Sequence, residues 1–210
     1  LGGRVVSTTG EAWLIASHAG DGCPVLSEAL CLVEGAPRRS DRFGNCEEPA
    51  ALETVSHPAF ALPDLEGNSR EFSEWDGSHR LLNFWATWCA PCRREIPLLK
   101  DFQDQHGPDG FQVLGIAVDF REEVELYAEE AEFNYPVLIG QQDAMAVAEG
   151  SGIEFIGMPF TMFVTRDGEY VGAYIGELHQ SHLNDVVSIL TRLDNAEITR
   201  EEARGALGLL

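Results

Sequence analysis

Two cysteines, separated by two residues, stand in the middle of the segment Asn83-Phe84-Trp85-Ala86-Thr87-Trp88-Cys89-Ala90-Pro91-Cys92-Arg93-Arg94-Glu95-Ile96-Pro97. The run before them, residues 80–86, is almost entirely apolar and is typical of a buried strand. Residues 91–106 follow with apolar side chains at the three- to four-residue spacing of one helix face. Cys89 is therefore predicted to lie where a buried strand is succeeded by a helix, with Pro91 in the first turn, where its missing N–H costs nothing.

This position gives the first cysteine a chemical advantage. Unpaired amides and the positive end of the helix dipole favour a thiolate over a thiol at Cys89. Such cysteines are nucleophiles at neutral pH. Cys92 lies one turn deeper, so its sulfur can close a disulfide with that of Cys89. The pair can then exchange disulfides by attack of Cys89, formation of a mixed disulfide and resolution by Cys92.

A C-x-x-C pair can also serve other purposes in proteins. Half of a zinc site is one alternative, but the remaining cysteines form no second C-x-x-C and the histidines lack the usual ligand spacing. An inert structural disulfide is another, although so short a loop stabilises little. A c-type haem site requires histidine after the second cysteine, and Arg93 occupies that position. The sequence therefore predicts a redox-active disulfide, with no metal and no separate cofactor.

Composition excludes several classes of partner. The chain has 210 residues, with 14 Lys and Arg against 35 Asp and Glu, so its formal charge is 14 − 35 = −21. Nucleic-acid binding is not expected, because phosphate contacts need Lys and Arg. Anionic membrane surfaces are disfavoured for the same reason. No apolar stretch approaches the roughly 18–20 residues that cross a bilayer.

The hydrophobic pattern beyond the cysteines predicts an α/β fold. Its elements follow the order β-α-β-α-β-α-β-β-α, which implies a central mixed sheet flanked by helices, with parallel strands first and an antiparallel hairpin last. Asp167-Gly168 is a strong hairpin signal between the last two strands. The predicted strands cover residues 80–86, 111–118, 136–139, 160–164 and 169–174, and the predicted helices cover residues 91–106, 122–132, 143–149, 178–193 and 199–207.

The segment from Asn83 to Pro97 resembles the TlpA/ResA/CcmG-type branch of the thioredoxin superfamily, a group of extracytoplasmic thiol-disulfide oxidoreductases. The resemblance extends from about His57 to Leu193. Gly157-Met158-Pro159-Phe160-Thr161 is similar to the superfamily's cis-proline loop, which faces the disulfide. Pro159 follows Cys92 by 159 − 92 = 67 positions, which leaves room for the helix-strand insertion of the branch, here residues 122–152.

The resemblance implies a role for each of several site residues. Pro159 would follow a cis bond and leave the Met158 backbone free to pair with a substrate segment. Glu95 would lie near Cys92, raise the pKa of its thiol and accept its proton; an ordinary acid that complements the helix dipole is the alternative. Trp88 is expected to flank Cys89 on the surface and Trp85 to lie in the core. The predicted catalytic set is Cys89, Cys92, Glu95 and Pro159, and the predicted substrate contacts are Trp88, Met158 and Pro91.

Three regions are expected along the chain. Residues 1–55 form an N-terminal extension to which no fold is assigned, residues 56–195 the thioredoxin-like domain, and residues 196–210 a helical tail. The extension contains Cys23, Cys31 and Cys46, of which two could pair as a structural disulfide in an oxidising compartment. An extension without ordered structure is the alternative.

The resemblance also implies a setting for the chemistry. Relatives of this branch act outside the cytoplasm, mostly as reductants of disulfides in apocytochrome c or other exported proteins, and receive electrons from a membrane protein. The chain is expected to be a monomer in the periplasm or a comparable compartment, although its first residues show no targeting pattern. A peroxiredoxin is one alternative, but Ala86 stands where that pattern needs threonine. A non-catalytic binding module of the same fold is the other.

Overall fold

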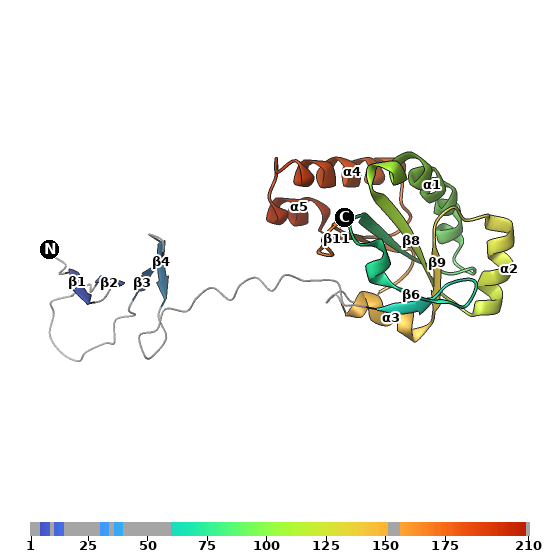
Figure 1. Cartoon of the computed structure of the whole chain (residues 1–210), viewed down its shortest axis with the longest axis horizontal. Coiled ribbons are helices and arrows are strands. Elements are labelled where there is room, and N and C mark those ends of the chain that lie inside the picture. Colours follow the sequence, from blue (N-terminus) through green and yellow to red (C-terminus); the bar gives the residue numbers. More distant parts are fainter. Residues whose placement is uncertain are drawn as a thin grey trace. The chain divides into compact units, whose positions relative to one another are not determined.

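The computed structural model describes residues 60–150 and 156–208 in full, together with the backbone of four short strands nearer the N-terminus (Figure 1). The chain divides into two units, Leu1–Thr54 and Val55–Leu210, and each is considered by itself. In the first unit, β1 (Val5–Thr8), β2 (Glu11–Leu14), β3 (Leu30–Val33) and β4 (Ala36–Arg39) pair in that order as an antiparallel sheet. Cys31 belongs to β3, whereas Cys23 and Cys46 lie outside the described residues, so the predicted N-terminal disulfide stays a prediction.

The second unit is built around a mixed sheet with strand order β11-β10-β7-β8-β9. The central strand β7 (His79–Trp85) is buried along its whole length, as its apolar sequence predicts. It pairs in parallel with β8 (Phe111–Val118), which pairs in parallel with β9 (Val137–Gly140). On the other side, β10 (Phe160–Val164) and β11 (Tyr170–Ile175) run antiparallel. The predicted mixed sheet and its hairpin are confirmed.

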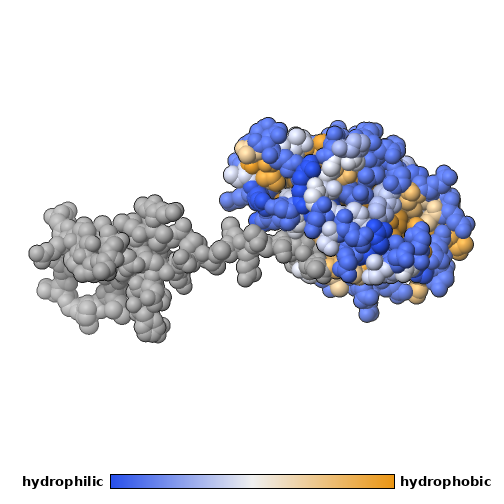
Figure 2. Space-filling view, in the orientation of Figure 1, coloured by the Kyte–Doolittle hydropathy of each residue, from blue (hydrophilic) through white to orange (hydrophobic). Residues whose placement is uncertain are grey.

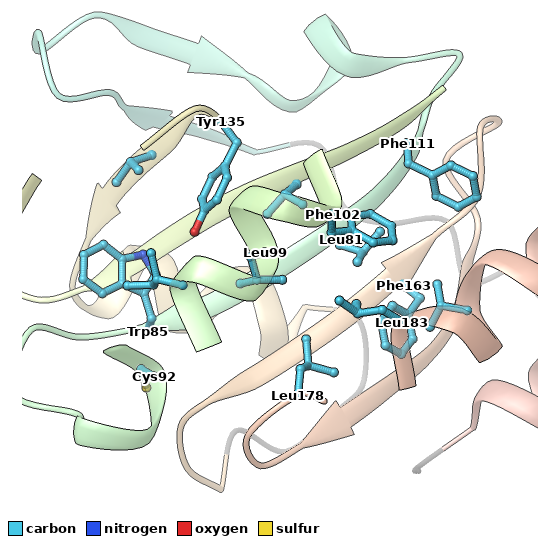
Figure 3. Packing of buried hydrophobic residues seen from close by; sticks show 14 of the residues in the cluster. Leu81, Trp85, Cys92, Leu99, Phe102, Phe111, Tyr135, Phe163, Leu178 and Leu183 are labelled. Atoms are coloured by element: carbon cyan, nitrogen blue, oxygen red, sulfur yellow. The ribbon is translucent and has the colours of Figure 1, made fainter. Parts of the chain in front are cut away.

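Helices cover both faces of this sheet (Figure 1). One apolar core lies under α1 (Ala90–His106) and α4 (Gln180–Asp194) and includes Cys92, Leu99 and Leu183, as Figure 3 shows. A second core lies on the opposite face under α3 (Gln142–Glu149). The helix α2 (Arg121–Ala131) packs through Val124, whereas Leu126 is 68% exposed, so its apolar side chains are only partly buried. The visible surface of the described part is mainly hydrophilic, with separate hydrophobic areas (Figure 2).

A hairpin near the start of the unit was not predicted from the sequence. It consists of β5 (Ala61–Pro63) and β6 (Ser69–Glu71) and is followed by the short helix η1 (Phe72–Trp75). Asp64 closes its turn by accepting a hydrogen bond from the Asn68 amide at 2.8 Å, and Gly67 adopts a positive φ of 85° there. Strands of three residues are too short to show an alternating pattern, which explains the omission.

The predicted helical tail is α5 (Arg200–Leu207), which lies against the edge strand β11. It buries Ala203 and Leu207. Gly172 permits this close approach, because a Cβ atom at that position would overlap the backbone carbonyl of Leu207. The Thr199 side chain caps α5 by accepting a hydrogen bond from the Glu202 amide at 3.2 Å.

Candidate active site

The two motif cysteines form a disulfide at the N-terminus of α1. Cys89 is the N-cap residue, and its sulfur accepts a hydrogen bond from the Cys92 amide at 3.3 Å. That contact, together with the open end of the helix, would stabilise a thiolate at Cys89 once the disulfide is reduced. Cys89 retains 6% exposure whereas Cys92 is fully buried, so Cys89 is the sulfur that an incoming substrate can reach.

The turn before Cys89 is held by an acidic residue from the next strand. Asp119 follows β8 directly, and one of its carboxylate oxygens accepts hydrogen bonds from the Thr87 amide at 2.9 Å and the Thr87 hydroxyl at 2.7 Å. The other oxygen accepts from the Phe120 amide at 2.8 Å. This clasp fixes the path of the chain between β7 and α1, and hence the position of Cys89.

Glu95 lies one turn beyond Cys92 on α1 and is 1% exposed. Its carboxylate accepts a hydrogen bond from the side-chain amide of Asn83 at 2.7 Å and another from the backbone amide of Leu178 at 2.6 Å. The same Asn83 amide also donates to the Thr161 hydroxyl at 2.9 Å. A buried network therefore joins the helix that carries both cysteines to strands β7 and β10.

Burial dominates the electrostatics of this acid. It raises the pKa of Glu95 to about 7, although the hydrogen bonds from Leu178 and Asn83 oppose the rise. The charge of nearby Glu177 adds to it. Burial together with the charge of Glu95 also raises the pKa of Tyr135. Glu95 is thus placed to gain or lose a proton near neutral pH, where thiol chemistry needs it.

The proline loop lies at the same end of the sheet as the disulfide. The Met158–Pro159 bond is cis, as the resemblance implies. Phe160, the first residue of β10, pairs with Phe84 near the end of β7, and because the two strands are antiparallel, the start of β10 lies beside the end of β7 that leads to Cys89. Pro159 is buried and its carbonyl accepts a hydrogen bond from Gly176 at 2.9 Å, whereas Met158 is half-buried.

The remaining predicted contacts differ in exposure. Trp88 is 70% exposed beside Cys89, whereas Trp85 is 1% exposed in the core, as predicted for each. Pro91 is half-buried in the first turn of α1. Within residues 60–150 and 156–208, no three side chains of His, Cys, Asp or Glu are arranged to hold a metal ion.

The structure thus brings Cys89, Cys92 and Glu95 together on one helix and sets the proline loop at the same edge of the sheet. Sequence reasoning missed Asp119, Thr87 and Thr161, which position these groups. The position of Asp119 did carry a signal, since polar residues that follow buried parallel strands gather at the carboxyl edge of a sheet. The pairing of Asp119 with Thr87, however, could not be predicted from the sequence.

The model of the AhpC/TSA family matches residues 55–171. The chain belongs to this family. Among curated relatives, the thiol-disulfide oxidoreductase ResA of Geobacillus thermodenitrificans is 32% identical over 124 residues, which cover 59% of this chain and 69% of ResA. This AhpC/TSA-family protein is therefore a thiol-disulfide oxidoreductase.

Solved structures agree on the fold of this AhpC/TSA-family protein. A thiol:disulfide interchange protein of the thioredoxin family from Chlorobium tepidum is 26% identical with a TM-score of 0.60, and the match covers 67% of this chain and 99% of that protein. The thioredoxin domain of a thiol-disulfide oxidoreductase from Bacteroides vulgatus is 28% identical with a TM-score of 0.55, over 66% and 97% of the two chains. The fold is thioredoxin-like.

Proposed function

We propose that this thiol-disulfide oxidoreductase reduces protein disulfides outside the cytoplasm, with apocytochrome c among its candidate substrates. In the first step, the Cys89 thiolate attacks one sulfur of a substrate disulfide, forms a mixed disulfide and releases the other substrate sulfur as a thiolate. In the second, the Cys92 thiolate attacks the Cys89 sulfur, releases the second substrate thiolate and closes the Cys89–Cys92 disulfide. Two electrons pass to the substrate, so a dithiol donor must reduce the enzyme again.

Glu95 serves the second step in this scheme. Cys92 is fully buried, so its thiol needs a nearby base to lose its proton before it can attack. A carboxylate with a pKa of about 7 is such a base, and it lies one turn away on the same helix. The proton moves from the Cys92 sulfur to Glu95 as the Cys89–Cys92 bond forms.

The single observation that carries the direction of electron flow is the burial of Glu95 beside a fully buried Cys92. A strong oxidant of this fold owes its high potential to a stabilised reduced form. Here, burial and a neighbouring carboxylate both disfavour a thiolate at Cys92, so the reduced form gains little from ionisation of that thiol. Compared with a site in which Cys92 ionises as well as Cys89, this arrangement favours a lower potential, and it supports a role as a reductant.

The proposed compartment, electron donor and substrates are based on similarity to known proteins. The sequence resembles the branch whose members act outside the cytoplasm, and its curated relatives include the ResA proteins. On that basis a membrane protein is the proposed electron donor, and disulfide-bearing exported proteins are the proposed substrates. No helix in the described part of the chain is long and apolar enough to span a membrane.

The redox potential tests the direction. A value near −270 mV, as in thioredoxin, would support the reductant role, and one near −120 mV, as in the strong oxidant DsbA, would contradict it.

A Cys92→Ala variant, which cannot resolve the mixed disulfide, should trap substrates on Cys89, and Cys89→Ala should trap none. An oxidised peptide with the C-x-x-C-H motif of c-type haem attachment tests the substrate class. Equal rates on this peptide and on the same peptide with His replaced by Ala would contradict a preference for apocytochrome c.

A further inference from the structure

Arg93 is an unusual cation in this acidic protein. Within residues 60–150 and 156–208, every other arginine lies within ion-pair distance of a carboxylate, and Arg93 does not. Its neighbour Arg94, for example, pairs with Glu177 at 2.5 Å. The guanidinium of Arg93 lies instead over the ring of Tyr127, with its central carbon 5.1 Å from the ring centroid. A stacked guanidinium keeps the N–H groups at its edge free for an anion.

The position of Arg93 has a cost for the helix. It lies in the first turn of α1, where the positive end of the helix dipole disfavours a cation. The charge of Arg94 is offset by its ion pair with Glu177, whereas no carboxylate in the described part of the chain offsets that of Arg93. The charge of Arg93 therefore does not stabilise the helix, and its place beside the reactive cysteine indicates a functional role.

Arg93 also lines a groove of about 360 Å³ between α1 and α2. The groove runs along α1 from Arg93 past Ile96 and Pro97 to Lys100, the one lysine of the sequence. The Lys100 ammonium donates to the backbone carbonyl of Ala131 at 2.7 Å and has no carboxylate partner among the described residues. The acidic residues that line the groove, Asp101 and Glu130, lie outside ion-pair distance of both cations.

The geometry of α1 connects this groove to the exchange reaction. Arg93 is four residues after Cys89, its amide donates to the Cys89 carbonyl at 3.1 Å, and residues four apart lie on the same face of a helix. Four residues of helix rise about 6 Å, a distance that about two residues of extended chain also span. A polypeptide whose cysteine meets the Cys89 sulfur can therefore place its second or third neighbouring residue at Arg93.

We propose that Arg93 and the groove between α1 and α2 bind an acidic side chain of the polypeptide substrate, two or three residues from its reacting cysteine. This inference rests on protein-disulfide reduction as the function. The charge of the groove identifies the occupant. Arg93 and Lys100 have no carboxylate partner among the described residues of a chain of charge −21, so they select a segment that carries a carboxylate. The apolar side chains of Ile96, Pro97 and Tyr127 provide contact for the rest of the segment.

Three disulfide-bonded peptides that differ only at the second residue from the cysteine test this proposal. With Glu, Gln or Lys at that position, kcat/KM for the unaltered protein should fall in that order, by about two- to fivefold at each step. Arg93→Gln should remove the preference and Arg93→Glu should reverse it. Arg192→Gln on α4 removes the same charge away from the groove and should leave the preference intact. Added salt should weaken it.

Each other outcome contradicts the proposal. Equal rates on the three peptides would show that Arg93 does not select a carboxylate. A uniform fall on all three with Arg93→Gln, together with a raised pKa of the Cys89 thiol, would assign Arg93 to thiolate stabilisation instead. Failure to reduce any of the peptides would contradict the proposed reductase function itself, and this inference with it. Arg93 is exposed, so unchanged unfolding curves should confirm that its variants fold.

Discussion

The carboxylate of Asp119 and the side chain and amide of Thr87 form a clasp across 32 residues of sequence, with hydrogen bonds of 2.7 and 2.9 Å to one oxygen. Thr87 lies two residues before the reactive Cys89, and Asp119 directly follows the neighbouring strand β8. Disulfide exchange requires the attacking sulfur to approach along a defined direction. The clasp therefore contributes to catalysis through the position of Cys89, although Asp119 itself contacts no reacting atom.

Loss of this clasp should reduce both stability and rate. Asp119→Ala leaves the Thr87 amide without its acceptor, and we expect a loss of about 2–3 kcal/mol in the free energy of unfolding. Thr87→Val removes only the hydroxyl bond and should cost about 1 kcal/mol. Urea unfolding measures both values. Turnover on a disulfide peptide should fall about tenfold with Asp119→Ala and less with Thr87→Val; equal turnover in all three proteins would show that the clasp is purely structural.

Glu95 should control the resolving step. Replacement by Gln removes the base, so the mixed disulfide on Cys89 should resolve about 100-fold more slowly. In the unaltered protein, the rate of that step should rise as pH increases through about 7, where Glu95 ionises. Stopped-flow measurements of the mixed-disulfide lifetime between pH 5 and 9 test both expectations. An unchanged pH profile in Glu95→Gln would assign the ionisation to another group.

Stability should depend on pH through the same residue. The pKa of Glu95 is raised from 4.5 to about 7 in the folded protein. Its favourable contribution is therefore complete below pH 4.5 and is lost as pH rises through about 7, by about 3.5 kcal/mol at 1.4 kcal/mol per pKa unit. Glu95→Gln should flatten this slope of the unfolding free energy. If the slope between pH 4.5 and 7 is the same in the variant, Glu95 is not its source.

The tail helix α5 offers a matched pair of glycine substitutions. Gly172→Ala places a Cβ against the Leu207 backbone and should release α5, at a cost of about 2–3 kcal/mol from the exposure of Ala203 and Leu207. Gly205→Ala meets open space on α5 itself and should stabilise by up to about 1 kcal/mol. Hydrogen exchange of the α5 amides should increase with the first substitution and decrease with the second.

Peroxide reduction provides a separate check on the reaction class. Ala86 stands three residues before Cys89, where the peroxiredoxin pattern has threonine, and its methyl group is fully buried. Without that hydroxyl, we expect peroxide to oxidise Cys89 only at the slow rate of an unassisted thiolate, so that peroxide turnover stays close to that of a Cys89→Ser variant, which keeps Cys92 and the three N-terminal cysteines. Consumption of peroxide with a dithiol donor measures this. Rapid turnover that depends on Cys89 would identify a peroxidase and contradict the expectation.

The local features of this protein follow from its amino-acid sequence alone. The apolar run before Cys89 and the helix pattern after it placed both cysteines at a helix start, and the turn signal at Asp167-Gly168 predicted the final hairpin, because strand and helix periods and tight turns are set by neighbouring residues. The pairing of the three-residue strands β5 and β6 in a hairpin was not predicted, since so short a segment shows no period.

Which distant groups meet at the site depends on how the elements pack in three dimensions. The hydrogen bond from the Leu178 amide to Glu95 joins two residues that are 83 positions apart in the sequence. The hydrogen bond from Asn83 to Thr161 joins two that are 78 positions apart. Burial of Glu95, and hence its raised pKa, depends on packing of α1 against the sheet and α4. The pattern of a chain fixes its elements, but the water removed from a carboxyl group and the partners it receives depend on how those elements pack.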